Sequence, residues 1–511
     1  MLRSDAKTAL MPLRPTYTHS RAREYRAAGG PWDVPSLDAL VTEAAARAEG
    51  DLVVDDSAGV RLDGAGLEAR VAALAGGLRA TGVRRGDVVA WQAPNWHEVV
   101  LLYRACWRLG SIAGPIHHQA GPADVERMLT VLEPRVWLAP DDLRGPAATF
   151  PKLLDGKPVT RSAARASDLA VVLFTSGSTG GPKAALHTQR GLACKARAMA
   201  AAHEVTPADA ILMPAPLAHV SGLLNAVQVP GIVPMKVALM AKWDPEDALA
   251  AIERERITFM IGPPTFFVGL MDAPGFTPAR VETLRLVSSG GAGVTPAFVE
   301  RASATLGCRV KRTYGSTEAP TVTTSTPADS AERARDTDGH ATSPFLEMKL
   351  SEQGELLLRG PELFVGYTDP DQTRAAVTRG WFRTGDLATI DPDGWLTIVG
   401  RIKDIIIRGG ENIAAAEVEG VLEAHPAVRQ AVAVGYPDER LGERVCAFVV
   451  TTTPFDVEDC RRWFEERGVA RFKTPERVVR LDDLPVLAAG KPDRAALTRL
   501  ASPSPRGAGE K

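Results

Sequence analysis

Residues 174–183 read Phe-Thr-Ser-Gly-Ser-Thr-Gly-Gly-Pro-Lys and follow directly on the apolar run Leu-Ala-Val-Val-Leu of residues 169–173. A short apolar run that ends in serine and glycine predicts a buried strand followed by a loop. The loop segment combines three glycines and four hydroxyl side chains with a terminal lysine. Exposed backbone N–H groups, hydroxyl donors and one cation suit a polyphosphate, so we expect a phosphate-binding loop here.

Two better-known phosphate loops are excluded by the residues themselves. A Walker A loop needs Gly-Lys-Ser/Thr, whereas Pro182 precedes Lys183 and Ala184 follows it. No G-x-G-x-x-G of the dinucleotide-binding type lies nearby. A flexible linker is the plain alternative, but a linker would not adjoin a strand or contain Pro-Lys.

Outward from the loop, short apolar runs alternate with helix-like stretches. Residues 87–94, 257–264 and 284–291 are apolar and close on Gly, Pro or Ser, while residues 37–50 and 244–257 have helical periodicity. This pattern predicts an α/β protein, with a large N-terminal region of βαβ layered subdomains over residues 1–400. Shorter elements after Arg401 predict a small, mobile α+β C-terminal domain over 401–500. The polar tail of residues 501–511 is expected to be disordered.

Composition narrows the range of partners. The 511 residues are 45% hydrophobic and 24% charged, and 60 basic against 62 acidic side chains leave a net charge of −2. Such a chain has no overall field that would draw it to nucleic acid or to an anionic membrane. Five scattered cysteines without metal-binding spacing suit a reducing compartment, and neither a signal segment nor a membrane span is evident. We therefore expect a cytoplasmic protein.

The loop resembles the signature T-S-G-[ST]-T-G-x-P-K-G of the adenylate-forming enzymes, which include acyl-CoA synthetases, non-ribosomal adenylation domains and firefly-type luciferases. It departs from that signature only at Ala184. Further matches follow in the family's order, namely Tyr314-Gly-Ser-Thr-Glu318, Gly354-Glu-Leu-Leu-Leu-Arg-Gly360, Gly366-Tyr367, Thr384-Gly-Asp386, Gly400-Arg-Ile-Lys-Asp404, Gly409-Gly-Glu-Asn-Ile413 and Gly490-Lys491. The resemblance thus extends from Thr175 to Lys491, which is most of the chain.

The resemblance implies how ATP is held. The phosphates would lie on the loop, at Thr175, Ser176, Gly177, Ser178, Thr179, Gly180 and Lys183. Thr317 would contact the α-phosphate and Glu318 would hold Mg²⁺. Asp386 and Arg401 would bind the ribose hydroxyls. The adenine would be enclosed by Gly290, Gly291, Ala292, Tyr314 and Gly315.

The same resemblance assigns roles to the C-terminal domain. Lys403 would be the hinge about which the domain swings between an adenylating and a thioester-forming pose. Gly409 and Gly410 would line the channel for the pantetheine arm of CoA. Lys491 would be the catalytic lysine of the first step. The chain has only 13 lysines, and Lys183, Lys403 and Lys491 all fall at motif positions. As plain alternatives, Lys403 is an exposed charge, Asp386 is a solvated turn residue, and Gly290 and Gly291 are turn residues after a strand.

The resemblance implies an acyl pocket between the His219 region and Tyr314, lined by His219 and Gly290. Residues 218–235 and 257–271 contain no Asp, Glu, Lys or Arg, which argues against a dicarboxylate such as malonate because a second carboxylate would be buried unpaired. Some of these residues also serve the core. Residues 92–96 and 314–320 resemble most the medium-chain or alicyclic acyl-CoA ligases. Chain length, ring and branching stay open.

These inferences lead to an ATP-dependent acid:CoA ligase for a hydrophobic monocarboxylic acid, with ATP, Mg²⁺ and CoA as its small-molecule requirements. Three alternatives remain: loading of a carrier-protein phosphopantetheine, luciferase-like oxygen chemistry, and a nucleotide sensor without turnover. No sequence feature demands oxygen chemistry, and a sensor could lose Lys491 freely. The oligomeric state is open, a homodimer included.

Overall fold

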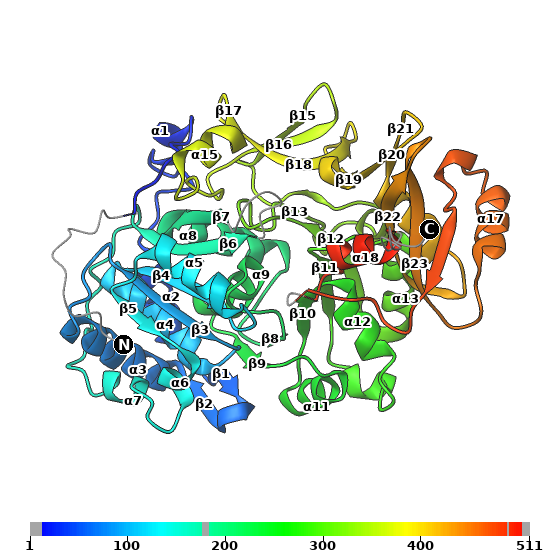
Figure 1. Ribbon diagram of the computed structural model, residues 1–511. Coiled ribbons are helices and arrows are strands. Elements are labelled where there is room, and N and C mark those ends of the chain that lie inside the picture. Colours follow the sequence, from blue (N-terminus) through cyan, green and yellow to red (C-terminus); the bar gives the residue numbers. More distant parts are fainter. Residues whose placement is uncertain (1–12, 176–182, 488–489, 503–511) are drawn as a thin grey trace, which may run out of the picture.

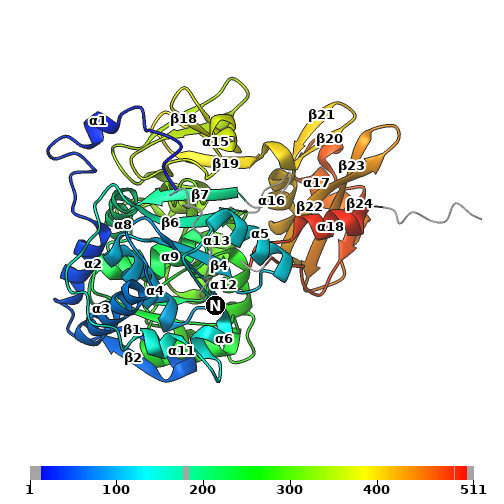
Figure 2. The same ribbon diagram turned by 60° about the vertical axis from the view of Figure 1, so that its left-hand side comes forward.

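Four β-sheets organise the chain in the computed structural model, which describes residues 13–175, 183–487 and 490–502 (Figure 1). Two of the sheets carry the helices of the N-terminal region, a third lies across them, and the fourth belongs to the C-terminal domain. Figure 2 shows this last domain standing at one end of the molecule.

The sheet whose strands flank the predicted phosphate loop has the strand order β5-β3-β4-β6-β7. Its strands are β3 (Val88–Ala93), β4 (Ile112–His117), β5 (Val136–Leu138), β6 (Leu169–Thr175) and β7 (Lys183–Thr188), of which only β7 is antiparallel to its neighbour. Thr175 pairs with Lys183 across β6 and β7. Both ends of segment 176–182 are therefore fixed side by side at one end of this strand pair.

The second sheet has the order β14-β13-β12-β11-β10-β8-β9-β1-β2. Its strands are β1 (Asp51–Asp55), β2 (Val60–Asp63), β8 (Ala210–Met213), β9 (Lys236–Leu239), β10 (Phe259–Gly262), β11 (Leu286–Gly290), β12 (Arg309–Tyr314), β13 (Thr323–Thr324) and β14 (His340–Ala341). From β1 through β9 to β12 the pairing is parallel, with crossover helices α11 (Pro245–Glu255), α12 (Pro264–Met271) and α13 (Pro296–Leu306). The predicted βαβ layering is confirmed.

Residues 347–401 differ from the expectation of parallel layers. They form an antiparallel sheet of β15 (Glu347–Leu350), β16 (Glu355–Arg359), β17 (Val377–Thr378), β18 (Trp381–Ile390) and β19 (Leu396–Arg401). Gly354, Gly380 and Gly394 have φ of 78°, 80° and 87° in the tight turns. Turns this short leave no room for the helix that a parallel connection needs.

The C-terminal domain has its own sheet and its own core. The strands are β20 (Ile405–Arg408), β21 (Glu411–Ala414), β22 (Val428–Asp438), β23 (Gly442–Thr451) and β24 (Arg477–Arg480), and the helices are α16 (Ala415–Glu423), α17 (Val457–Glu466) and α18 (Arg494–Ala501). Ile413, Val418, Val445 and Phe464 are fully or almost fully buried within it. The antiparallel sheet thus ends at Arg401 and the next begins at Ile405. Most of the predicted tail, residues 503–511, lies outside the described residues.

Most of the remaining helices cover the two large sheets and their connections, whereas α15 (Pro370–Ala376) contacts β17 and β18 of the antiparallel sheet. They are α1 (Ala22–Tyr25), α2 (Leu37–Ala45), α3 (Gly64–Ala80), α4 (His97–Leu109), α5 (Pro122–Leu132), α6 (Pro140–Arg144), α7 (Phe150–Leu153), α8 (Gln189–Ala202), α9 (Val220–Leu223), α10 (Val229–Ile232), α14 (Ala331–Asp336) and α15 (Pro370–Ala376), with a π-helical turn over Leu224–Gln228. Within the described ranges, every helix is too short or too polar to cross a bilayer.

Candidate active site

Lys183 and Glu318 meet at one aromatic ring. The Lys183 ammonium lies 5.4 Å from the ring centroid of Tyr367, and the Tyr367 hydroxyl donates to Glu318 Oε1 at 2.6 Å. Burial first, and then the charge of Glu318, raise the pKa of Tyr367 well above its usual value, so its hydroxyl stays a donor. Two residues predicted for phosphate and metal are thereby brought together by Tyr367, which had been assigned no role.

The turn after β12 is held from several sides. The Nε2–H group of buried His187 donates to the Thr317 carbonyl at 2.8 Å. At Gly315 an added Cβ would lie 2.3 Å from the Thr321 nitrogen, so only glycine fits. The positions of Thr317 and Glu318 are therefore set by backbone contacts rather than by a free loop.

Asp386 lies between two donors. The Tyr314 hydroxyl donates to Asp386 Oδ2 at 2.6 Å, and Arg401 Nε lies 2.9 Å from Oδ1. Asp386 and Arg401 face one another across β18 and β19, and Asp386 is only 3% exposed. This burial argues against the alternative that Asp386 is a solvated turn residue.

Lys491 reaches this region from the C-terminal domain. A Cβ added to Gly291 would lie 3.2 Å from Lys491 Cε, so the lysine stem lies against the loop that follows β11. That loop is itself restricted to glycine, because a Cβ on Gly290 would lie 2.4 Å from the Thr313 carbonyl oxygen and Gly291 has φ of 81°. The structure thus places Lys491 beside Gly291, while the catalytic role that the resemblance implies for it remains a prediction.

The charge of Lys491 is tuned by its surroundings. Burial, followed by the positive charge of Arg401, lowers the pKa of Lys491 to about 8, while Asp386 and Glu318 act in the opposite direction. Asp386 and Glu318 belong to the N-terminal region, and Arg401 is the last residue of β19, where the two domains meet. A lysine with this pKa is still mainly an ammonium at neutral pH and can neutralise developing negative charge.

His219 stands in a cluster of neutral imidazoles. The His219 ring lies edge to face against the His117 ring, with 5.4 Å between the ring centroids. The His117 ring in turn stacks on that of His118, with 4.5 Å between the centroids. Burial, and then the Lys491 charge, lower the pKa of His219 to about 4, and burial with the two neighbouring imidazoles lowers that of His117 to about 3. This wall of the expected acyl pocket therefore carries no charge at neutral pH.

The other predicted residues of the C-terminal domain lie on its surface. Lys403 is exposed in a short 3-10 turn between β19 and β20. Gly409 and Gly410 form the turn between β20 and β21, with φ of 58° and 91°, and a Cβ added to Gly410 would meet nothing within 4 Å. The surroundings of Gly410 are therefore open in this pose, whereas the charge of Lys403 still acts on Lys491 and lowers its pKa.

Five predicted loop residues, Ser176, Gly177, Ser178, Thr179 and Gly180, lie outside the described residues. Thr175 and Lys183 at its two ends are described, and Ala292 follows Gly291 half-buried. The binding roles assigned to all of these residues remain predictions.

Sequence reasoning missed Tyr367, His187, His117 and His118. Tyr367 belongs to the quoted Gly366-Tyr367 motif, so the motif was a usable signal, but its partner Glu318 is 49 residues away in the chain. The paired His117-His118 directly ends a buried strand, and polar residues at a strand end are a further signal of a site.

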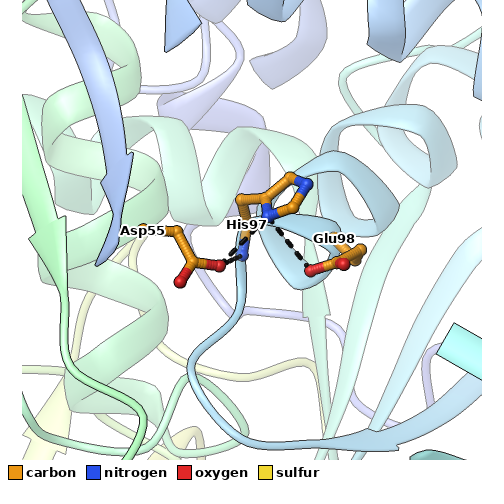
Figure 3. A group of neighbouring side chains, drawn as sticks. All are labelled: Asp55, His97 and Glu98. Carbon is orange, nitrogen blue, oxygen red and sulfur yellow. Dashed lines mark hydrogen bonds and ion pairs between the residues drawn. The ribbon is translucent and has the colours of Figure 1, made fainter. Parts of the chain in front are cut away.

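A separate acidic cluster has metal-like composition. Asp55, His97 and Glu98 gather their ligand atoms within 4.8 Å, and His97 Nδ1 lies 3.0 Å from Asp55 and 3.2 Å from Glu98 (Figure 3). The guanidinium of Arg144 donates to both carboxylates, at 2.6 Å for Glu98 Oε2. Because a cation already neutralises them, this cluster is better explained as an ion-pair network that fastens α4 and α6 to β1.

Comparison with known proteins places the chain in a family. Residues 41–368 match the AMP-binding enzymes, and residues 417–491 match the AMP-binding enzyme C-terminal domain. The medium-chain fatty-acid–CoA ligase of Escherichia coli strain K12 is 32% identical over 528 residues, covering 94% of this chain and 93% of that protein. A feruloyl-CoA synthase of an Amycolatopsis species is 33% identical over 463 residues, which cover 85% of this chain and 92% of that protein.

The fold agrees with these matches. ATP-bound MatB from Rhodopseudomonas palustris superposes with a TM-score of 0.82 at 27% identity, covering 91% of this chain and 98% of that one. Fold, site and matches together define an adenylate-forming enzyme. The chain belongs to the AMP-binding enzyme family.

Proposed function

We propose that the protein is an ATP-dependent acid:CoA ligase that joins a hydrophobic monocarboxylic acid to AMP, releases pyrophosphate, and passes the acyl group to CoA. The observation that carries the proposal is the position of Lys491. It comes from the C-terminal domain and lies against Gly291, within the electrostatic influence of Asp386 and Glu318. A lysine delivered by a second domain to a nucleotide site suits a reaction in two separable steps.

In the first step the chain must bring two anions together. A carboxylate does not acylate a thiol because its leaving group would be an oxide, so the acid first attacks the α-phosphorus and pyrophosphate leaves. The Lys491 ammonium would neutralise charge shared by the carboxylate and the α-phosphate. The phosphates would be held by Thr317, the 175–180 loop and Lys183. The ribose would be bound by Asp386 and Arg401, and the adenine by Gly290, Ala292 and Tyr314.

Glu318 would hold the Mg²⁺ that accompanies ATP. The site fits a hard cation, because Glu318 is a buried carboxylate that Tyr367 orients through one oxygen. When bound, Mg²⁺ would offset negative charge on the phosphates.

In the second step the C-terminal domain would turn about Lys403 and bring Gly409 and Gly410 to the acyl-AMP. A glycine pair lets a pantetheine arm pass close to backbone. The change of sheet falls between Arg401, which ends β19, and Ile405, which begins β20, and this supports a domain boundary near the proposed division at residues 400 and 401. The β20–β21 hairpin, which carries Gly409 and Gly410, lies on the surface in this pose. Its exposure supports the proposed role, because the hairpin is free to enter the active site when the domain turns.

The acid is proposed to be hydrophobic and to carry one carboxylate. His219 and His117 are held neutral by burial, and neither of the segments 218–235 and 257–271 supplies a charge. A second carboxylate would find no cation there. The two relatives named above are called ligases of an aliphatic and of an aromatic acid, so we propose a class of acid and not one compound.

A panel of acids tests this function. Purified protein with ATP and Mg²⁺ should release pyrophosphate only with hydrophobic monocarboxylates, and addition of CoA should give acyl-CoA. A holo-carrier protein is offered in parallel, since its acylation in place of CoA would favour the carrier-loading alternative. Glu318→Gln should weaken turnover at low Mg²⁺. Absence of acid-dependent pyrophosphate release across the whole panel would refute the proposal.

A further inference from the structure

The surface between the two domains carries polar contacts that touch no reacting group. The Thr295 hydroxyl donates to Glu423 Oε2 at 2.8 Å, and Arg429 forms an ion pair with Asp272. Closer to Lys491, the Thr265 hydroxyl donates to the Gly490 carbonyl at 2.6 Å. Every one of these contacts joins the N-terminal region to the C-terminal domain, so each exists only while the domain is docked.

We propose that Thr295 and Glu423, assisted by Asp272 and Arg429, form a latch that holds the C-terminal domain in the adenylating pose and so positions Lys491. The inference rests on the proposed function, because it assigns these residues to one of its two steps. They are positioning residues and act only through Lys491.

The geometry ties the latch to the site. Thr295 lies four residues after Gly291, at the other end of the same loop, where it also caps α13 by accepting the Phe298 N–H at 3.2 Å. Glu423 ends α16, and its second oxygen accepts the Ala431 N–H at 3.1 Å. Since one short loop contacts both Lys491 and Glu423, loss of the latch should displace the lysine.

The charges around Glu423 make the latch reversible. Of the groups packed near it, Glu419 is paired with Arg494, and Arg301 donates to the Arg429 carbonyl at 3.3 Å. Glu423 therefore has no ion-pair partner among the described residues. Burial, partly offset by Thr295, raises the pKa of Glu423 to about 7. The Asp272–Arg429 pair is about 40% exposed at each partner, and such pairs contribute little. A weak latch suits a domain that must leave in every turnover.

Two substitutions at one position test the latch. Asp and Asn both cap helices well, so Thr295→Asp and Thr295→Asn should both preserve α13. The aspartate places a carboxylate against Glu423, whereas the asparagine amide can still donate to it. We expect Thr295→Asp to slow acyl-AMP formation about tenfold and Thr295→Asn about twofold at most. Docking of the Asp variant would bring two carboxyl groups together, and either their repulsion or the proton uptake that relieves it shifts the balance away from the docked pose. Both should convert supplied acyl-AMP and CoA to acyl-CoA at the wild-type rate.

Rescue separates a latch from a folding defect. Glu423→Gln removes the charge, so the Thr295→Asp/Glu423→Gln double variant should recover adenylation. Likewise Asp272→Arg and Arg429→Asp should each lose about threefold and recover together, as expected of a partly exposed ion pair. Equal losses of Thr295→Asp and Thr295→Asn, or equal losses in both half-reactions, would overturn the proposal.

A readout without activity distinguishes this inference from the proposed function. In a Cys308→Ser background, Asp272→Cys and Arg429→Cys allow a short bismaleimide to join the domains, because the other four cysteines are buried. Thr295→Asp should slow this cross-linking relative to Thr295→Asn. If the wild type releases no pyrophosphate with any acid but this difference appears, the function fails and the latch stands. If the wild type is active and the cross-linking rates are equal, the latch fails alone.

Discussion

Two glycine turns of the C-terminal domain lie in opposite environments. Gly490 is buried, with φ of 76°, and a Cβ there would lie 3.0 Å from Phe266 and 3.1 Å from Pro263 of the N-terminal region. Gly410 has φ of 91° and would meet nothing within 4 Å. One turn is docked and delivers Lys491, while the other is exposed.

The difference supports the proposal that this pose serves the first half of the proposed reaction. Around the exposed turn, Ile407 is 55% exposed and Ile402, next to Lys403, is 45% exposed. Large apolar side chains left in water on one face are typical of a surface that another surface covers. We infer that the structure holds the adenylating arrangement and that the β20–β21 face awaits the second one.

The largest effect is expected from removing the docked lysine. Lys491→Ala should slow acyl-AMP formation by about a hundredfold or more, because a preorganised charge at the transition state is lost. Acyl-CoA formation from supplied acyl-AMP should stay near the wild-type rate. Quenched-flow assays of each half-reaction measure both.

Lys473→Ala is the matched control, since Lys473 belongs to the same domain and pairs with Glu417 away from Gly291. It should change neither half-reaction. Equal loss in both half-reactions for Lys491→Ala would give Lys491 a structural role and remove the contrast between the two turns.

The exposed turn should behave in the opposite way. Gly410→Leu should slow the transfer of the acyl group to CoA by roughly tens of times, because the added side chain would block a pantetheine path that has room only for backbone. Acyl-AMP should therefore accumulate. Adenylation should be retained. Leucine is strained at positive φ, so Gly468→Leu serves as control, because Gly468 has φ of 65° in the same domain and equally open surroundings. Normal CoA turnover by Gly410→Leu would show that the thiol enters elsewhere.

The sequence identified the motifs Gly409-Gly410 and Gly490-Lys491 and gave them different roles, but it did not predict which of them is docked in this structure. Several βαβ strands could be predicted because they are continuous apolar runs, such as residues 169–173 and 259–262, which are buried. The antiparallel sheet of residues 347–401 was missed because the alternation of the preceding segments was extended over it, although its short glycine turns are typical of hairpins. Contacts such as Thr295 with Glu423 join residues 128 positions apart, and no local pattern encodes them.

A smaller and graded effect is expected from pH. With a pKa of about 8 in the docked pose, Lys491 loses its proton as pH rises through 8, so adenylation should fall up to about tenfold per unit above that value. The carboxylic acid is fully ionised over this range and adds no slope. Lys491→Arg should remove the decline, since a guanidinium stays charged. Transfer from supplied acyl-AMP should show no such decline, because the lysine would then have left the site. A parallel decline in both steps would contradict the assignment.

The smallest effect is expected from Tyr367, which belongs to the N-terminal region and contacts neither turn. Tyr367→Phe removes the hydroxyl that donates to Glu318 at 2.6 Å but keeps the ring beneath Lys183. Glu318 keeps its charge in this variant and loses only its orientation, so the apparent KM for Mg²⁺ should rise about threefold. This size is expected for the loss of one hydrogen bond to a charged group when water replaces part of that bond. The kcat of adenylation at saturating Mg²⁺ should change little, and transfer to CoA should not change. Glu318→Gln should exceed this effect, since it removes the charge itself. If Tyr367→Phe raised the KM for Mg²⁺ as much as Glu318→Gln does, the tyrosine would do more than orient the carboxylate. If Tyr367→Phe changed only the transfer to CoA, the site around Glu318 would serve the second step rather than the first.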